Sequence, residues 1–191
     1  MNFRAIPVIA LLVTLASAQS RTSLDAELAR LNVHTALLVH SQGVDDTPVW
    51  SPDSRFLGVN IAGKWLKVDT ANVHLQEATW HEQRVAVLAD KSELQSLSKE
   101  EVGQWAKVSR QGDSVVQGRS GFKAEMQRHE LSSSLVLLRR GHRLVLWRSV
   151  LENCGALGLS PSGSRLAYVC ELNGVLVTDV ERAFSSATPS N

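Results

Sequence analysis

The sequence predicts an all-β protein built from antiparallel meander sheets, with a short N-terminal helix and one helix inserted between strands. Three observations lead to this fold class. Beyond residue 33 the apolar runs are strand-length, turn-forming residues separate them, and a ten-residue segment with a Ser-Pro turn occurs twice. A chain of 191 residues, 43% of them hydrophobic, is long enough to form its own core as a single domain.

The first eighteen residues have the pattern of a secretory signal peptide. Arg4 precedes an apolar run, and the small residues at 16–18 form a cleavage site. The run is shorter than the roughly 20 residues that a membrane-spanning helix needs, and it contains Pro7. We therefore expect residues 1–18 to be a signal peptide, and the mature protein to be periplasmic or secreted, with no transmembrane span.

The charge balance argues against nucleic acid as a partner. Lys and Arg number 20, Asp and Glu number 19, and the leader holds one of the arginines. The mature chain therefore has no net formal charge, and it lacks the basic field that attracts nucleic acid.

The expected elements follow one another along the chain. Residues 19–32 form a helical segment, in which Leu24, Leu28 and Leu31 recur at helical spacing behind a cap at Thr22 or Ser23. Strand-length runs follow at 35–39, 56–61, 66–68, 84–89, 135–138, 144–147, 166–170 and 175–178. Three dipeptides that tolerate positive φ mark the reversals: Ala62-Gly63, Arg140-Gly141 and Asn173-Gly174.

The inserted helix has a clear N-terminal signal. Ser98 and Glu101 have the spacing of a capping box, and Leu97 and Val102 that of a hydrophobic staple. We expect this helix to pack on the rim of a sheet, and a partner-binding helix is the alternative.

The two cysteines follow the predicted leader and flank a predicted hairpin whose turn lies at 160–164. An exported protein permits disulfides, so we expect a structural bridge between Cys154 and Cys170, which contributes about 3 kcal/mol for a loop of this size. A reactive thiol pair would need the closer Cys-x-x-Cys spacing. A zinc site would need more ligands.

The internal repeat is the most informative feature. The segment WSPDSRFLGV at 50–59 aligns without gaps on LSPSGSRLAY at 159–168. Each copy continues through a Gly-containing hairpin into a strand that ends in an aspartate, Asp69 or Asp179. Proline, serine, aspartate and glycine are turn-forming residues, so these positions are expected to build turns first.

This pattern resembles the WD-like repeat of TolB-type β-propellers. The first copy carries it on Pro48, Trp50, Ser51, Pro52, Asp53, Ser54, Leu57 and Gly58, and the second on Ser160, Pro161, Gly163, Leu166 and Ala167. The resemblance implies a β-propeller-like domain over 33–184 with about four blades, at 33–71, 72–112, 113–151 and 152–184, before a flexible tail at 185–191. The blades would form a small closed ring, an open array, or a ring completed by a second copy.

The resemblance also implies a function. TolB-like propellers are protein-interaction modules of the bacterial envelope, so we expect a non-catalytic scaffold without a cofactor, which binds another envelope or secreted protein. A small secreted hydrolase and a self-assembling repeat fragment are the alternatives.

Catalytic and metal-binding patterns are weak. Gly112-Asp113-Ser114 is similar to the GDS element of a lipase family, but no Asp-x-x-His follows it, and a loop is the simpler interpretation. Six histidines are scattered at 34, 40, 74, 81, 129 and 142. No catalytic residue and no metal ligand is therefore assigned.

Two further features have alternative interpretations. Trp50, Trp65 and Trp80 are fifteen residues apart, which suits either a stacking platform or, as we favour, one core layer of successive strands. The basic turn at 139–143 could hold a carboxylate or phosphate, although a hairpin tip needs solvated residues in any case.

Overall fold

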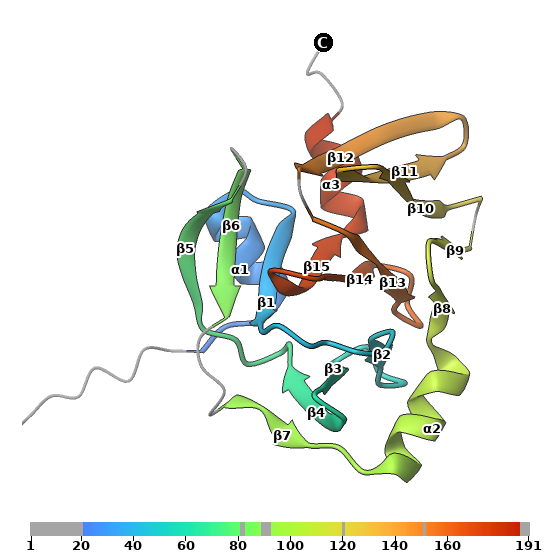
Figure 1. The fold of residues 1–191 in the computed structure, drawn as a ribbon. Helices are drawn as coiled ribbons and strands as arrows, with labels where there is room; N and C mark the ends of the chain where they lie inside the picture. Colours follow the sequence, from blue (N-terminus) through green and yellow to red (C-terminus); the bar gives the residue numbers. More distant parts are fainter. Residues whose placement is uncertain (1–20, 81–82, 89–92, 120, 151, 188–191) are drawn as a thin grey trace, which may run out of the picture.

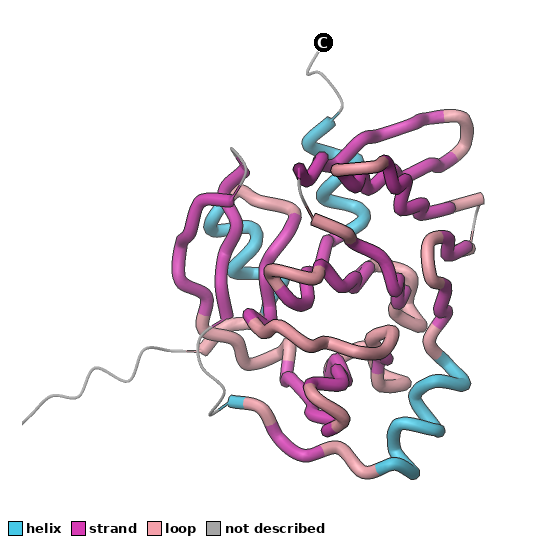
Figure 2. Tube along the Cα trace, in the orientation of Figure 1, coloured by secondary structure: helices cyan, strands magenta, loops and turns pink. Residues whose placement is uncertain are grey.

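The computed structural model describes residues 21–80, 83–88, 93–119, 121–150 and 152–187. The predicted leader therefore lies outside the described residues. The three helices are α1 (Leu24–Leu31), α2 (Lys99–Val108) and α3 (Val180–Ala187), and they lie at the periphery of a mainly β structure (Figures 1 and 2). The strands are β1 (Thr35–His40), β2 (Val49–Trp50), β3 (Phe56–Ile61), β4 (Lys64–Asp69), β5 (Leu75–Trp80), β6 (Gln83–Leu88), β7 (Gln95–Ser96), β8 (Arg110–Gly112), β9 (Val115–Gln117), β10 (Lys123–His129), β11 (Ser132–Arg139), β12 (His142–Val150), β13 (Cys154–Leu159), β14 (Arg165–Cys170) and β15 (Gly174–Asp179).

The strands form three sheets, and the prediction of an antiparallel β protein is confirmed. The largest sheet has the order β5-β6-β1-β15-β14-β13-β8, and the other two are β12-β11-β10-β9 and β2-β3-β4-β7. Among the strands that the structure describes, pairing is antiparallel except between β1 and β6. The N-terminal strand β1 thus lies beside the C-terminal strand β15, which joins the two ends of the β region in one sheet (Figure 1).

The seven-stranded sheet lies between two core clusters, because its central strands are apolar on both faces. Along β15, Val175 and Val177 face the cluster that contains the α1 leucines and Trp50, whereas Leu176 faces the cluster with Leu135 of β11. A strand with two buried faces reads as a continuous apolar run rather than an alternating one. This sheet is therefore the centre of the molecule, with the two smaller sheets on its sides.

The prediction of about four blades differs from the structure, which has three sheets that do not close on themselves within the described residues. The strands of the second predicted unit, 72–112, are divided. Of these, β5, β6 and β8 extend the seven-stranded sheet, and β7 pairs with β4. This unit lacks the Ser-Pro turn that marks the two clear copies, so only strand spacing suggested a separate sheet there.

Local elements match their sequence signals. The Ala62-Gly63 and Arg140-Gly141 pairs form hairpin turns with positive φ at both residues, and Gly174 has a φ of 104°. The capping box of α2 is formed: the Ser98 hydroxyl accepts from the Glu101 N–H, and the Glu101 carboxylate accepts from the Ser98 N–H. The helix packs through Trp105 against Val49 and Leu97 at the edge of the β2-β3-β4-β7 sheet.

Helix α3 differs from the sequence-based expectation, in which the β domain ends at 184 and a flexible tail follows at 185–191. The Asp179 carboxylate accepts a hydrogen bond from the Arg182 N–H and caps the helix. The helix then buries Val180 and Ala183 in the cluster that also contains Leu135. The apolar spacing and an aspartate at the N-terminus are both helix signals. Here the same aspartate, Asp179, also ends the last strand of the repeat, and that role obscured the helix.

The predicted disulfide between Cys154 and Cys170 is present. The two residues face one another on β13 and β14 with Cα atoms 4.2 Å apart, and both are buried. The adjacent β14–β15 turn is held by the buried carboxylate of Glu152, which accepts hydrogen bonds from the backbone N–H groups of Leu172 and Asn173.

Candidate functional site

The two Ser-Pro turns have the same internal geometry, which explains their residue types. In the first, the Ser51 hydroxyl accepts from the Phe56 N–H at 2.8 Å, and in the second the Ser160 hydroxyl accepts from the Arg165 N–H at 3.1 Å. The third residue after each serine has positive φ: 61° at Ser54 and 80° at Gly163. These turn residues therefore hold the backbone.

Pro52 and Pro161 follow the two serines at the first turn position, where the fixed φ of proline suits the turn. In the first copy, the Asp53 carboxylate adds bonds from the Ser51 hydroxyl and the Arg55 N–H, which lower the Asp53 pKa. The second copy has no aspartate there. Instead, the Ser162 hydroxyl is hydrogen-bonded to the hydroxyls of Ser160 and Ser164.

The two copies contact one another directly. The Ser162 N–H of the second turn donates to the Ser54 hydroxyl of the first at 3.3 Å. Deeper in the molecule, the Trp50 indole N–H donates to the Gly158 carbonyl at 2.9 Å. A Cβ atom at Gly158 would lie 2.3 Å from the Pro48 carbonyl oxygen, so only glycine permits this approach of β2 to β13.

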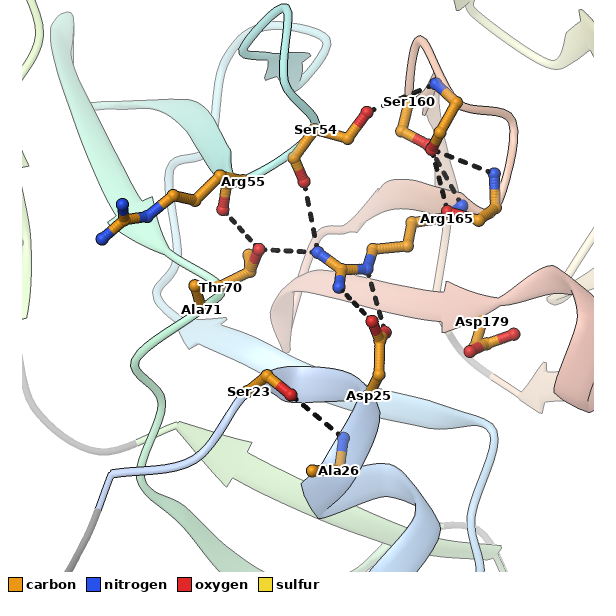
Figure 3. Close-up of polar contacts among 12 residues, drawn as sticks. Ser23, Asp25, Ala26, Ser54, Arg55, Thr70, Ala71, Ser160, Arg165 and Asp179 are labelled. Carbon is orange, nitrogen blue, oxygen red and sulfur yellow. Dashed lines mark hydrogen bonds and ion pairs between the residues drawn. The ribbon is translucent and has the colours of Figure 1, made fainter.

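Arg165 joins three parts of the chain beside the paired turns (Figure 3). Its guanidinium binds both carboxylate oxygens of Asp25, at 3.1 and 2.6 Å, and donates to the Ser54 carbonyl and to the Thr70 hydroxyl. We call these four residues the Arg165 junction. The Arg165 side chain is only 12% exposed, whereas that of Asp25 is 55% exposed. The junction is therefore a half-buried contact between α1, the first turn and the end of β4.

Replacing Arg165 with Met should lower the free energy of unfolding by about 2 kcal/mol, because hydrogen bonds to a partly buried charged group are lost together. The matched control is Arg55→Met. Arg55 also binds an aspartate, Asp69, with both carboxylate oxygens and lowers the Asp69 pKa to about 2, but its side chain is 46% exposed.

Because solvent reaches the Arg55 guanidinium, this pair should contribute less than the Arg165 junction, although the Asp69 side chain is only 19% exposed. Urea unfolding followed by circular dichroism measures both variants. Equal losses would contradict the junction's structural role.

Arginines gather beside the second Ser-Pro turn. A cavity of about 360 Å³ is lined by residues of the β9–β10 loop, the β11–β12 hairpin tip, the second turn and the start of α3, among them Arg119, Arg139, Arg140 and Glu181. A second cavity, of about 560 Å³, shares Arg139 and Arg140 and continues to Arg143. We call the two cavities together the arginine groove.

The charges of the arginine groove are unevenly paired. Arg139 forms an ion pair with Glu181 and packs with its Cζ atom 4.5 Å from the centroid of the Phe184 ring. Within the described part of the chain, Arg119 and Arg140 have neither an ion pair nor a side-chain hydrogen bond. The groove is therefore lined by four arginines and one carboxylate, although the whole chain is nearly neutral.

A third cavity lies next to His34, whose ring nitrogen is 2.9 Å from the Thr35 hydroxyl. The hydroxyls of Thr35 and Thr178 are bonded in turn at 2.8 Å inside the core. Burial lowers the His34 pKa, while the Asp179 carboxylate partly opposes the shift. Burial thus favours the neutral form of His34, which lies at the half-buried end of this polar chain.

Because the folded state has the lower His34 pKa, the unfolded chain binds the proton more tightly, and stability falls as the pH drops through and below 6.5. We expect the difference in unfolding free energy between the wild type and His34→Asn to shrink between pH 8 and pH 5.5. Urea unfolding of both proteins at each pH measures this difference in free energy. A difference that stays constant with pH would contradict a lowered His34 pKa.

The residues considered for catalysis lie on separate elements. Asp113 and Ser114 form the turn between β8 and β9, and their carbonyl groups accept from the N–H groups of Ala156 and Met126. His40 ends β1 and His129 ends β10, while His81 lies outside the described residues.

Within the described residues, the only cluster of three potential metal ligands is Glu152 with the two disulfide cysteines. Disulfide sulfurs are not thiolates, so this cluster does not offer a metal site.

Trp50 and Trp65 do not share one core layer. Trp50 is fully buried in the cluster with the α1 leucines, whereas Trp65 packs in the separate cluster with Trp105. The side chain of Trp80 lies outside the described set. Because Trp50 has no exposed surface, it cannot stack with a ligand, and a shared platform with Trp65 is not formed.

No protein-family model, no curated protein and no solved structure matches this chain. The resemblance to TolB-like repeats therefore depends on the motif residues themselves. Of the helices in the described ranges, none has the length and apolar character needed to cross a bilayer.

Two features of the site were missed by sequence reasoning. Arg165 occupies the place of Phe56 in the aligned repeat, and a charged residue at an apolar repeat position was the signal that could have indicated the junction. Arg119 joins the predicted basic turn only in the folded chain, so no local pattern could have found it.

Proposed function

We propose that this protein is a non-catalytic, exported scaffold of the TolB-like repeat type that binds another envelope or secreted protein. One observation carries the proposal: turns from separate sheets meet on one surface, where the arginine groove adjoins the paired Ser-Pro turns. Loops held by a rigid β scaffold are where binding sites concentrate.

The repeat geometry supports the family assignment. Both turn copies use the same hydroxyl-to-backbone bond, and each connects two antiparallel neighbours, β2 with β3 in the first copy and β13 with β14 in the second. The pairing of β1 with β15 places the two ends of the β region in one sheet. That the three sheets correspond to propeller blades is part of this proposal.

A small hydrolase is the competing function, and it predicts that Ser114 or Asp113 takes part in chemistry. Among the described residues, Asp113, His40 and His129 do not gather into one cluster of side-chain ligand atoms, which favours the scaffold. A self-assembling fragment, including a dimer that completes a ring, predicts a mass that grows with concentration.

Crosslinking of the mature chain, residues 19–191, in an extract of its native envelope and medium tests the proposal. We expect one protein to be captured reproducibly, with a monomeric mass in light scattering. Hydrolysis of an ester or glycoside panel that disappears in Ser114→Ala would overturn the proposal, and so would a stable homo-oligomer without a foreign partner.

A further inference from the structure

Four cations line the arginine groove, and the internal ion pair shows what kind of group they accept. Glu181, in the first turn of α3, places its carboxylate on Arg139. This leaves Arg119 and Arg140, which have no charged partner in the described part of the chain, on the same cavity. Arginine binds carboxylates through a planar fork of N–H donors, so the groove has unused capacity for further carboxylates.

The shape of the groove favours an extended ligand. The two cavities share Arg139 and Arg140, so the cationic lining runs from Arg119 past the hairpin tip to Arg143. Apolar side chains also line the groove: Phe122 and Val180 in one cavity, and Leu144 and Phe184 in the other. A single small anion would contact only part of this surface, whereas a peptide presents a carboxylate or an apolar group every few ångströms.

We propose that the arginine groove binds an acidic peptide segment of a protein partner, whose carboxylates pair with Arg119 and Arg140 and compete with Glu181 for Arg139. This inference depends on the proposed scaffold function and names the chemistry of its partner. The bound segment would replace an internal carboxylate by an external one at Arg139 and add new pairs at the two free arginines.

The turn geometry allows a variant that removes charge without disturbing the fold. Arg140 has a φ of 49° at the first position of a two-residue hairpin turn, where asparagine is preferred over most residues. Arg140→Asn should therefore keep or improve the hairpin, and Arg119→Gln changes an exposed side chain. The control pair Lys99→Gln and Arg148→Gln removes two charges from exposed positions that do not line the groove.

The probe is hexaglutamate with both ends blocked, titrated into the full mature chain at low salt and followed by calorimetry. We expect the Arg119→Gln/Arg140→Asn variant to bind at least tenfold more weakly, and the Lys99→Gln/Arg148→Gln control to bind within about twofold of the wild type. Glu181→Gln, which frees Arg139, should bind several-fold more tightly. Circular dichroism verifies that each variant is folded.

Equal affinities for the groove and control variants, or the absence of binding, would overturn the inference. Tighter binding of inorganic pyrophosphate than of hexaglutamate, with the same dependence on Arg119 and Arg140, would also overturn it in favour of a phosphate ligand. If the groove variant still captures the crosslinked partner as well as the wild type, the scaffold function stands and the groove assignment fails.

Discussion

Replacing Trp50 with Ala should lower the free energy of unfolding by about 3–5 kcal/mol, one of the largest effects expected in this chain. Trp50 has no exposed surface and lies in the cluster shared by α1, the seven-stranded sheet and the β2-β3-β4-β7 sheet. The substitution also removes the indole bond to the Gly158 carbonyl, which connects the two repeat copies. The cavity and the lost hydrogen bond therefore weaken the packing of α1 and of both sheets against one another.

The matched control is Trp65→Ala, which removes the same side chain from a half-buried position in the cluster with Trp105. We expect it to lower stability by less than half as much. Trp50→Phe, which keeps most of the apolar contact and loses the N–H donor, should fall between the two. Urea unfolding by circular dichroism gives all three values, and an equal loss for both alanine variants would contradict a central role for Trp50.

The second large effect is expected from the Cys154→Ala/Cys170→Ala variant, which should be less stable by about 3 kcal/mol. The bridge joins residues 16 apart in the chain and restricts the unfolded chain more than the folded one. In the folded state the hairpin has other supports, namely the β13–β14 ladder and the Glu152 carboxylate on the adjacent turn. We therefore expect the fold to persist without the bridge.

Unfolding with and without a reducing agent separates the stability contributed by the disulfide bond from that contributed by the packing of the cysteine side chains. The reducing agent should destabilise the wild type by nearly the same amount as the double substitution and leave the variant unchanged. A wild type that is equally stable when reduced would contradict an unfolded-state effect. Retention of the circular dichroism spectrum by the folded variant is the accompanying check.

Elements that depend on residues close together in the sequence were predicted well. The capping box at Ser98 and Glu101 starts α2, and glycine hairpins at Ala62-Gly63 and Arg140-Gly141 reverse the chain as expected. The Cys154–Cys170 bridge follows from the same local logic, because the cysteines sit opposite one another on neighbouring strands of one hairpin. The cap and the turns are each contained in a few adjacent residues, and the bridge, whose cysteines are 16 residues apart, is contained in one hairpin.

The candidate site was predictable only in part. The basic turn around Arg140 and both Ser-Pro turns were identified, but the pairing of the Ser162 N–H with the Ser54 hydroxyl joins residues 108 apart. Arg165 reaches Asp25 over a separation of 140 residues. Such contacts depend on how the sheets pack, which the spacing within one segment does not encode.

The sequence by itself therefore determined the β class, the turns, the inserted helix and the disulfide, because these depend on φ preferences, capping and neighbouring strands. Only the tertiary structure decided that β1 lies between β15 and β6, that residues 72–112 are shared between two sheets, and that Arg119 meets Arg139 and Arg140 in one groove. The physical reason is that these arrangements are chosen by burial of apolar faces from distant segments, which compete for the same partners across the whole chain.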